Sequence, residues 1–187
     1  MSSIKLKGST SGDVTITVPA EAGTNTITLP ATTGTMLDTN SVINKAKLPA
    51  GAIVQMIHVT DTGVNSTTGT TYVTSGIAAH ITPRAAANKI IVMACGSVYI
   101  SGANQQASTT IFRDSTNLGN SERGIIQFWD TGDLFQGDTT MTLTDHPNTT
   151  NAVTYALYFR KLSSGGDAVH IGVDNSTQYM TLLEVQV

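Results

Sequence analysis

Short stretches in which apolar and polar residues alternate follow one another along most of the chain. No long stretch places apolar residues three and four positions apart, as an amphipathic helix would. From residue 51 onward the alternating stretches are separated by polar turns, which is typical of sandwiches and barrels. The pattern therefore predicts an all-β protein, with an antiparallel β-sandwich or jelly-roll head domain over residues 51–187. The expected strands cover residues 52–60, 71–73, 78–82, 89–100, 108–113, 139–143, 152–162, 168–173 and 178–187.

Two of these expected strands, 89–100 and 152–162, are apolar on both faces. A sandwich strand that faces solvent on one side normally alternates apolar with polar residues. The second face of each strand must therefore be covered, either by another copy of the chain or by a long loop of the same chain. We expect a homo-oligomer, and the loop remains the alternative.

Residues 1–38 contain three short alternating segments, 4–7, 14–18 and 26–29, with Gly, Ser and Thr turns between them. The sequences TITVPA and TITLPA begin eleven residues apart, at Thr15 and Thr26. Strands this short cannot bury a core by themselves and need partners. We therefore interpret residues 1–38 as an assembly or attachment segment. The apolar positions expected to make its contacts are Val14, Ile16, Val18, Ile27 and Leu29.

Residues 39–50 connect the two parts. Asn40 or Ser41 can cap one or two helical turns, which the sequence LPAG at 48–51 would end. We expect a short connector here, with one or two turns of helix.

Composition narrows the classes of function. Only 12% of the 187 residues are charged, 31 are threonine, and the net charge is −3. The ten Lys and Arg residues are scattered, so no basic surface for nucleic acid is expected. The N-terminus lacks a signal-sequence pattern, and no apolar run reaches the roughly 18 residues of a membrane span. We expect synthesis in a host cytoplasm without membrane insertion.

Candidate chemistry is sparse. The four histidines lie far apart, the single cysteine lies in an apolar run, and no nucleophile–base or paired-carboxylate pattern is present. We expect no enzymatic activity, no cofactor and no metal site.

The stretch FWDTGDLFQGD, residues 128–138, gathers aromatic rings and carboxylates in what the sequence predicts to be a loop. Rings that supply flat apolar area beside orienting polar groups are typical of recognition surfaces. A solvated loop whose rings pack on the sandwich, or a loose calcium site, would explain the same residues. The polar loop at 145–151 would join this surface if both lie at one end. The receptor-binding candidates are Phe128, Trp129, Asp130, Asp133, Phe135, His146 and Asn148.

Residues 4–38, IKLKGSTSGDVTITVPAEAGTNTITLPATTGTMLD, resemble the short β-repeat segment of tail fibre proteins from tailed bacteriophages of marine bacteria and cyanobacteria. The stretch LPAGAIVQMIHVT at 48–60 resembles the start of their distal β domain, and residues 70–100 resemble its first long hairpin. The resemblance implies a trimeric, fibre-associated virion protein. The loops of that family vary, so no receptor-binding residue is transferred from it.

The expected function is a short tail fibre or fibre tip that binds a glycan or protein of the bacterial host surface without catalysis. Residues 1–38 would bind other virion proteins. A trimeric capsid decoration protein, which stabilises the phage head, is the alternative. A carbohydrate-active depolymerase fits less well, because the chain is short and poor in acidic residues.

Overall fold

The computed structural model describes residues 3–17, 23–24, 31, 48–102, 104–132, 134–163 and 166–187. The chain divides into two compact units, Met1–Val42 and Ile43–Val187, and each is described by itself. All regular secondary structure in the described residues is β-strand, so the expected all-β fold is confirmed.

The first unit contains an antiparallel hairpin of β1 (Ser3–Lys7) and β2 (Asp13–Thr17). Ile4 stands opposite Ile16 in this hairpin, and their side chains and that of Leu6 are exposed. The third expected strand, 26–29, lies outside the described residues. Two strands that expose their aliphatic side chains have no core of their own, which agrees with a need for partners.

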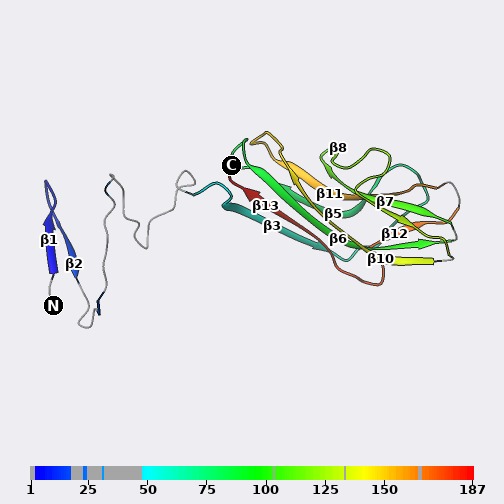
Figure 1. Ribbon diagram of the computed structural model, residues 1–187, viewed down its shortest axis with the longest axis horizontal. Helices are drawn as coiled ribbons and strands as arrows, with labels where there is room; N and C mark the ends of the chain where they lie inside the picture. The colour runs from blue at the N-terminus through cyan, green and yellow to red at the C-terminus, as the bar shows by residue number, and fades with distance from the viewer. Residues whose placement is uncertain are drawn as a thin grey trace. The chain divides into compact units, whose positions relative to one another are not determined.

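The second unit is a sandwich of two antiparallel sheets (Figure 1). In the six-stranded sheet the order is β3-β13-β6-β12-β4, and β10 pairs with the other edge of β6. Its strands are β3 (Ile53–Asp61), β4 (Asn65–Thr67), β6 (Lys89–Ser101), β10 (Leu134–Asp145), β12 (Val169–Ile171) and β13 (Gln178–Val185).

The five-stranded sheet has the order β5-β11-β7-β8, and β9 also pairs with β7. Its strands are β5 (Val73–Ile81), β7 (Gln106–Arg113), β8 (Thr116–Asn117), β9 (Ile126–Trp129) and β11 (Val153–Lys161).

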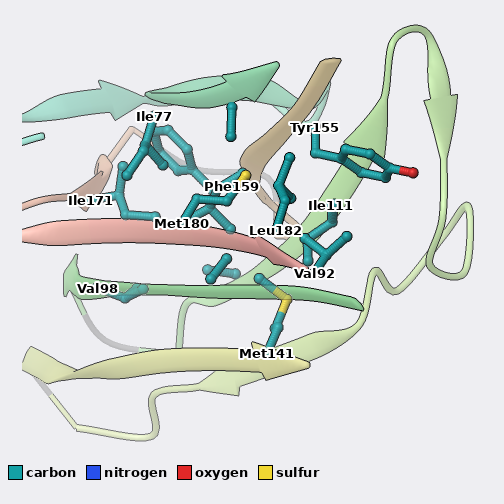
Figure 2. Close-up of a cluster of buried hydrophobic side chains, with 14 of the residues drawn as sticks. Ile77, Val92, Val98, Ile111, Met141, Tyr155, Phe159, Ile171, Met180 and Leu182 are labelled. Carbon is teal, nitrogen blue, oxygen red and sulfur yellow. The ribbon is translucent and has the colours of Figure 1, made fainter. Parts of the chain in front are cut away.

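The hydrophobic core lies between the two sheets (Figure 2). Ile111 and Phe159 of the five-stranded sheet and Leu182 of the six-stranded sheet are fully buried. Burying an aliphatic or aromatic side chain of this size contributes roughly 1.5–3 kcal/mol. The hydroxyls of Thr109 and Thr139 lie 2.8 Å apart across the core and satisfy each other.

Two strands differ from the expected list in an informative way. Val73 of the expected segment 71–73 and residues 78–81 of the expected segment 78–82 belong to one strand, β5. In β5, Ser75, Gly76 and Ile77 stand opposite the single residue Leu157 of β11. Gly76 has a φ of +97°, a conformation that side chains with a Cβ rarely adopt. The bulge interrupts the alternating pattern and made one strand look like two.

The ends of the sandwich have different structures. At one end, here called the linker end, Gly51 donates its N–H to the carbonyl of Gln186, and Gln186 donates to Ala52. The chain therefore enters the sandwich beside its own C-terminus (Figure 1). Residues 49–52 form a turn there, and the helical turns expected earlier in the connector fall outside the described residues. The opposite end, here called the distal end, carries the connections after β6, β9 and β11.

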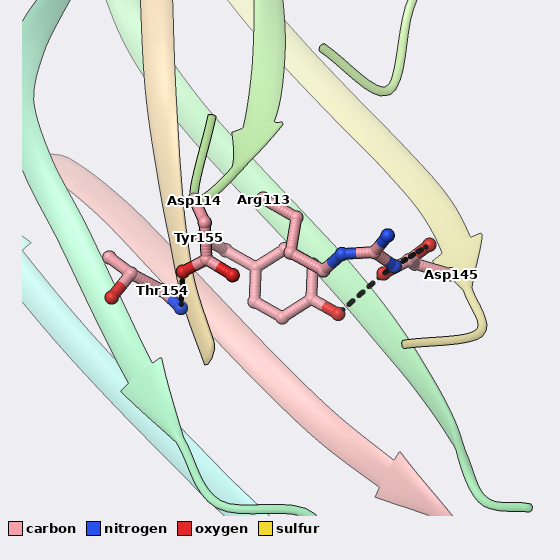
Figure 3. Close-up of polar contacts among 5 residues, drawn as sticks. All are labelled: Arg113, Asp114, Asp145, Thr154 and Tyr155. Atoms are coloured by element: carbon pink, nitrogen blue, oxygen red, sulfur yellow. Dashed lines mark hydrogen bonds and ion pairs between the residues drawn. The ribbon is translucent and has the colours of Figure 1, made fainter. Parts of the chain in front are cut away.

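A polar clamp joins the sheets at the linker end (Figure 3). The guanidinium of Arg113 on β7 donates to both carboxylate oxygens of Asp145 at the end of β10, at 2.9 and 2.7 Å. The hydroxyl of Tyr155 on β11 donates to the same carboxylate at 2.6 Å. Burial, reinforced by this hydrogen bond to Asp145, raises the pKa of the Tyr155 phenol far above its ordinary value of 10.0.

We expect Tyr155→Phe to lower the free energy of unfolding by about 1–3 kcal/mol at neutral pH, because a hydrogen bond to a charged group is lost without a cavity. Above about pH 10 the unfolded wild type releases the phenol proton, which the native state retains, so wild-type stability falls with pH. Urea denaturation from pH 7 to about pH 11 should therefore show the difference between the two proteins shrinking. A difference that stays constant across this range would contradict the clamp.

Candidate functional site

The aromatic stretch at 128–138 includes the ends of two strands at the distal end, β9 of the five-stranded sheet and β10 of the six-stranded sheet, rather than one loop. β9 ends at Trp129 and β10 begins at Leu134. Neighbouring residues of a strand point to opposite faces. Phe128 accordingly lies in the core, 8% exposed and 5.4 Å between ring centroids from Phe135, whereas Trp129 is 68% exposed. Of the three rings in the predicted surface, the indole is the one available to a partner.

Asp130 lies in the turn that connects β9 to β10. It is 5% exposed, and its Oδ1 accepts the N–H of Gly132 at 2.9 Å. Its own N–H donates to the carbonyl of Gln105 at 2.9 Å. Asp130 is therefore a structural part of the turn. Asp133, the other carboxylate predicted for the recognition surface, lies outside the described residues. The receptor-binding role of these residues stays a prediction.

His146 and Asn148 do not lie with Trp129. They follow Asp145, which pairs with Ile90 at the linker end, whereas Leu134 pairs with Ser101 at the distal end. The twelve residues of β10 separate the two loops by about 40 Å. Both side chains are exposed, but the two loops do not form one surface.

The outer surface of the six-stranded sheet carries an apolar area that we call the outer apolar face. The register places Leu183 of β13 between Met56 of β3 and Ile91 of β6, with their side chains on one side of the sheet. Two residues along, Met93 and then Tyr179 extend the same face. Met56 is 64% exposed, and no described residue covers it. This strand face is the one that the two-sided pattern of residues 89–100 predicted to need a cover.

The second two-sided strand has a different outcome, because the chain itself covers it. Tyr72 lies over the outer surface of the five-stranded sheet, with its hydroxyl 2.9 Å from the Ser108 hydroxyl and its ring against Phe112. β8 adds a hydrogen bond, in which the Thr110 hydroxyl donates to the side-chain oxygen of Asn117 at 2.6 Å. Ala156 on this face is consequently only 8% exposed. Here the covering-loop alternative is the correct one.

The remaining candidate features are metal sites, membrane spans and the assembly residues of the N-terminal unit. Among the residues that the structure describes, no three His, Cys, Asp or Glu side chains are grouped so as to hold a metal ion. The same part of the chain has no helix long and apolar enough to cross a membrane. Of the assembly candidates, Ile16 is exposed and Val14 stands opposite Leu6 in the hairpin. Val18, Ile27 and Leu29 lie outside the described residues.

The adjacent positions 128 and 129 give a direct test of this placement. Phe128→Ala should lower the free energy of unfolding by about 3–5 kcal/mol, because it leaves a cavity in the core. Trp129→Ala should change it by less than about 0.5 kcal/mol, because the indole is exposed. Urea denaturation of both variants measures the difference, and similar losses would show that Trp129 is a packing residue.

Comparison with known proteins assigns no family to the chain. No family model and no curated protein matches the chain. Particle structures of infectious bursal disease virus are similar in part: the Gx strain at 13% identity and a TM-score of 0.40, and the VP2 subviral particle at 14% and 0.37. Each alignment covers 83% of this chain, but only 41% and 42% of the viral chains, so the chain spans less than half their length. Scores this low assign neither a family nor a function.

Proposed function

We propose that the chain is a structural protein of a virion that acts by binding, and more specifically a short tail fibre or fibre tip of a tailed bacteriophage. The observation that carries this proposal is the contrast between the two ends of the sandwich. The linker end holds the incoming chain beside the C-terminus, and the distal end presents an exposed indole at Trp129. A domain attached at one end presents the other to its surroundings.

The attachment half of the proposal rests on the N-terminal unit. Residues 4–38 resemble the β-repeat segment of phage tail fibres, and the hairpin within them exposes Ile4, Leu6 and Ile16. Exposed aliphatic side chains on a two-stranded unit favour burial against another protein. Other virion proteins, or copies of this chain, are the proposed partners.

The outer apolar face supports assembly of the head domain into a homo-oligomer. Among the possible oligomers, we propose a trimer. The apolar side chains of this face surround the hydrogen-bonded pair of His58 and Thr181, and Met56 is left exposed. Exposed apolar area on a sheet commonly marks a protein–protein contact. An oligomer would present several copies of the distal end, so that weak single contacts with a host surface combine through effective concentration.

A capsid decoration protein is the second candidate. The same outer apolar face and the same exposed Trp129 would serve contacts with a capsid lattice, and the distal end would then need no receptor. The two candidates differ in where the protein lies on the virion.

Immunogold electron microscopy of intact virions, with antibody raised against residues 51–187, separates the two. We expect label at the tail, together with reduced adsorption of virions that carry Trp129→Ala. Label spread over the head would favour decoration instead, and virions without label would exclude both.

The oligomer has its own test. Met56→Glu places a carboxylate on the outer apolar face, where burial of an unpaired charge is unfavourable. Light scattering coupled to size exclusion should show an oligomer for the wild type and monomer for the variant. Thr82→Glu, at an exposed position after β5, is the matched control and should remain oligomeric. A monomeric wild type, or an unaffected Met56→Glu, would overturn this interface.

A further inference from the structure

A hollow of about 340 Å³ lies on the outer surface of the six-stranded sheet, toward the distal end. Three of its side chains come from adjacent strands, because Tyr99 of β6 stands opposite Gln136 of β10 on one edge and His170 of β12 on the other. Residues directly opposite one another in a sheet share a face. Val173 and Asp174, from the connection after β12, complete the lining.

That connection exists because one edge of β6 changes partner. β12 and β13 both pair with this edge, Ile171 with Val98 and Tyr179 with Cys95. Seven residues, 172–178, therefore stand opposite only two, Gly96 and Ser97. Because the excess cannot lie in the sheet, residues 172–177 leave it and form a wall beside Tyr99 and His170.

The wall is held in one conformation. Gly172, Asp174 and Asn175 have φ values of 76°, 56° and 54°. Non-glycine residues adopt such values rarely and at a cost in free energy, and they do so where the surroundings enforce it. Ser97 provides the anchor: its carbonyl accepts the N–H of Gly172 at 3.0 Å, and its hydroxyl lies 2.5 Å from that of Ser176.

The chemistry of the lining is aromatic and polar. The rings of Tyr99 and His170 meet edge to face, with centroids 5.5 Å apart. The amide of Gln136 donates to Oδ2 of Asp174 at 2.5 Å, which orients both groups at the rim. The hollow thus combines ring surface and the Val173 side chain with an amide and a carboxylate of fixed direction.

The charge of the site selects among ligands. No Lys or Arg lines the hollow, and Asp138 follows Gln136 on the same face of β10. Two carboxylates with no Lys or Arg beside them disfavour an anionic ligand. A neutral sugar fits, because its C–H face packs on rings while its hydroxyls both donate to the Asp174 carboxylate and accept from the Gln136 amide.

We propose that this hollow is a binding site for a neutral pyranose unit of a surface polysaccharide. The proposal rests on the proposed function in naming the partner as a glycan. It assigns recognition to residues 99, 136, 170, 173 and 174, on the opposite sheet from Trp129. Volumes of this order are typical of small-molecule sites, and a few fixed polar groups in them provide specificity.

The test uses the full-length chain on an array of neutral and acidic oligosaccharides, followed by saturation-transfer difference NMR with the methyl glycosides of the neutral sugars bound. Tyr99→Ala should weaken binding about tenfold, as loss of a ring contact implies. Asp174→Asn should weaken it similarly while keeping the backbone, since Asn tolerates positive φ. Asp138→Asn, on the same strand face but outside the lining, is the matched control and should bind as the wild type does.

Binding to no neutral glycan, binding to acidic glycans alone, or equal loss in the Asp138→Asn control would each overturn the site. These outcomes are independent of virion labelling. A labelled tail with no sugar binding would remove the site and leave the proposed function, whereas sugar binding by a protein absent from virions would do the reverse.

Discussion

Strand β6 is the constraint on which the rest of the sandwich depends. Its thirteen residues pair with β10 along one edge and with β13 and then β12 along the other. One face of β6 lies in the core, where Ile90, Val92 and Ala94 are essentially inaccessible to solvent. The six-stranded sheet is thus assembled around this single strand.

The pattern of β6 does not by itself fix its register. A one-residue slip exchanges the faces of a strand, which is normally prohibitive because polar residues would enter the core. In β6 a slip would exchange Val92 for Met93, one apolar residue for another. The register must therefore be fixed by the partners. Glu184 of β13 is one of them: its buried Oε1 accepts hydrogen bonds from the N–H of Arg84 and the side-chain amide of Asn88, just before β6 begins.

The sequence predicted the features that follow from local pattern, and it failed where tertiary pairing decides. The sandwich and its long strands are readable from alternation and turn residues, whereas the assembly role of residues 1–38 stays a prediction. Residues 134–138 were expected to lie in a loop because Gly and Asp weaken strand propensity. They form the start of β10 because β6 offers them a complete ladder of partners. Propensity is a weak guide when pairing contributes this much.

The candidate sites show the same division between what local sequence pattern predicts and what tertiary pairing decides. Trp129 was found from composition, since a single tryptophan among acids is conspicuous, but composition did not show that its neighbour Phe128 faces the core. The hollow at Tyr99 was missed because its residues come from three separate segments. Its signal in the sequence is faint: Gly172 followed by Asp174 and Asn175, a cluster able to adopt positive φ. That cluster forms the wall of the hollow only because β12 and β13 both pair with one edge of β6.

That divided edge also bears on how the protein can change. β12 and β13 are each registered on β6 by their own hydrogen bonds, so residues 173–177 take no part in the strand pairing of either. Insertions and deletions there would alter the wall of the hollow while the sheet beneath keeps its geometry. Under selection to recognise new surfaces, this segment could vary in length and composition while the rest of the domain keeps its fold.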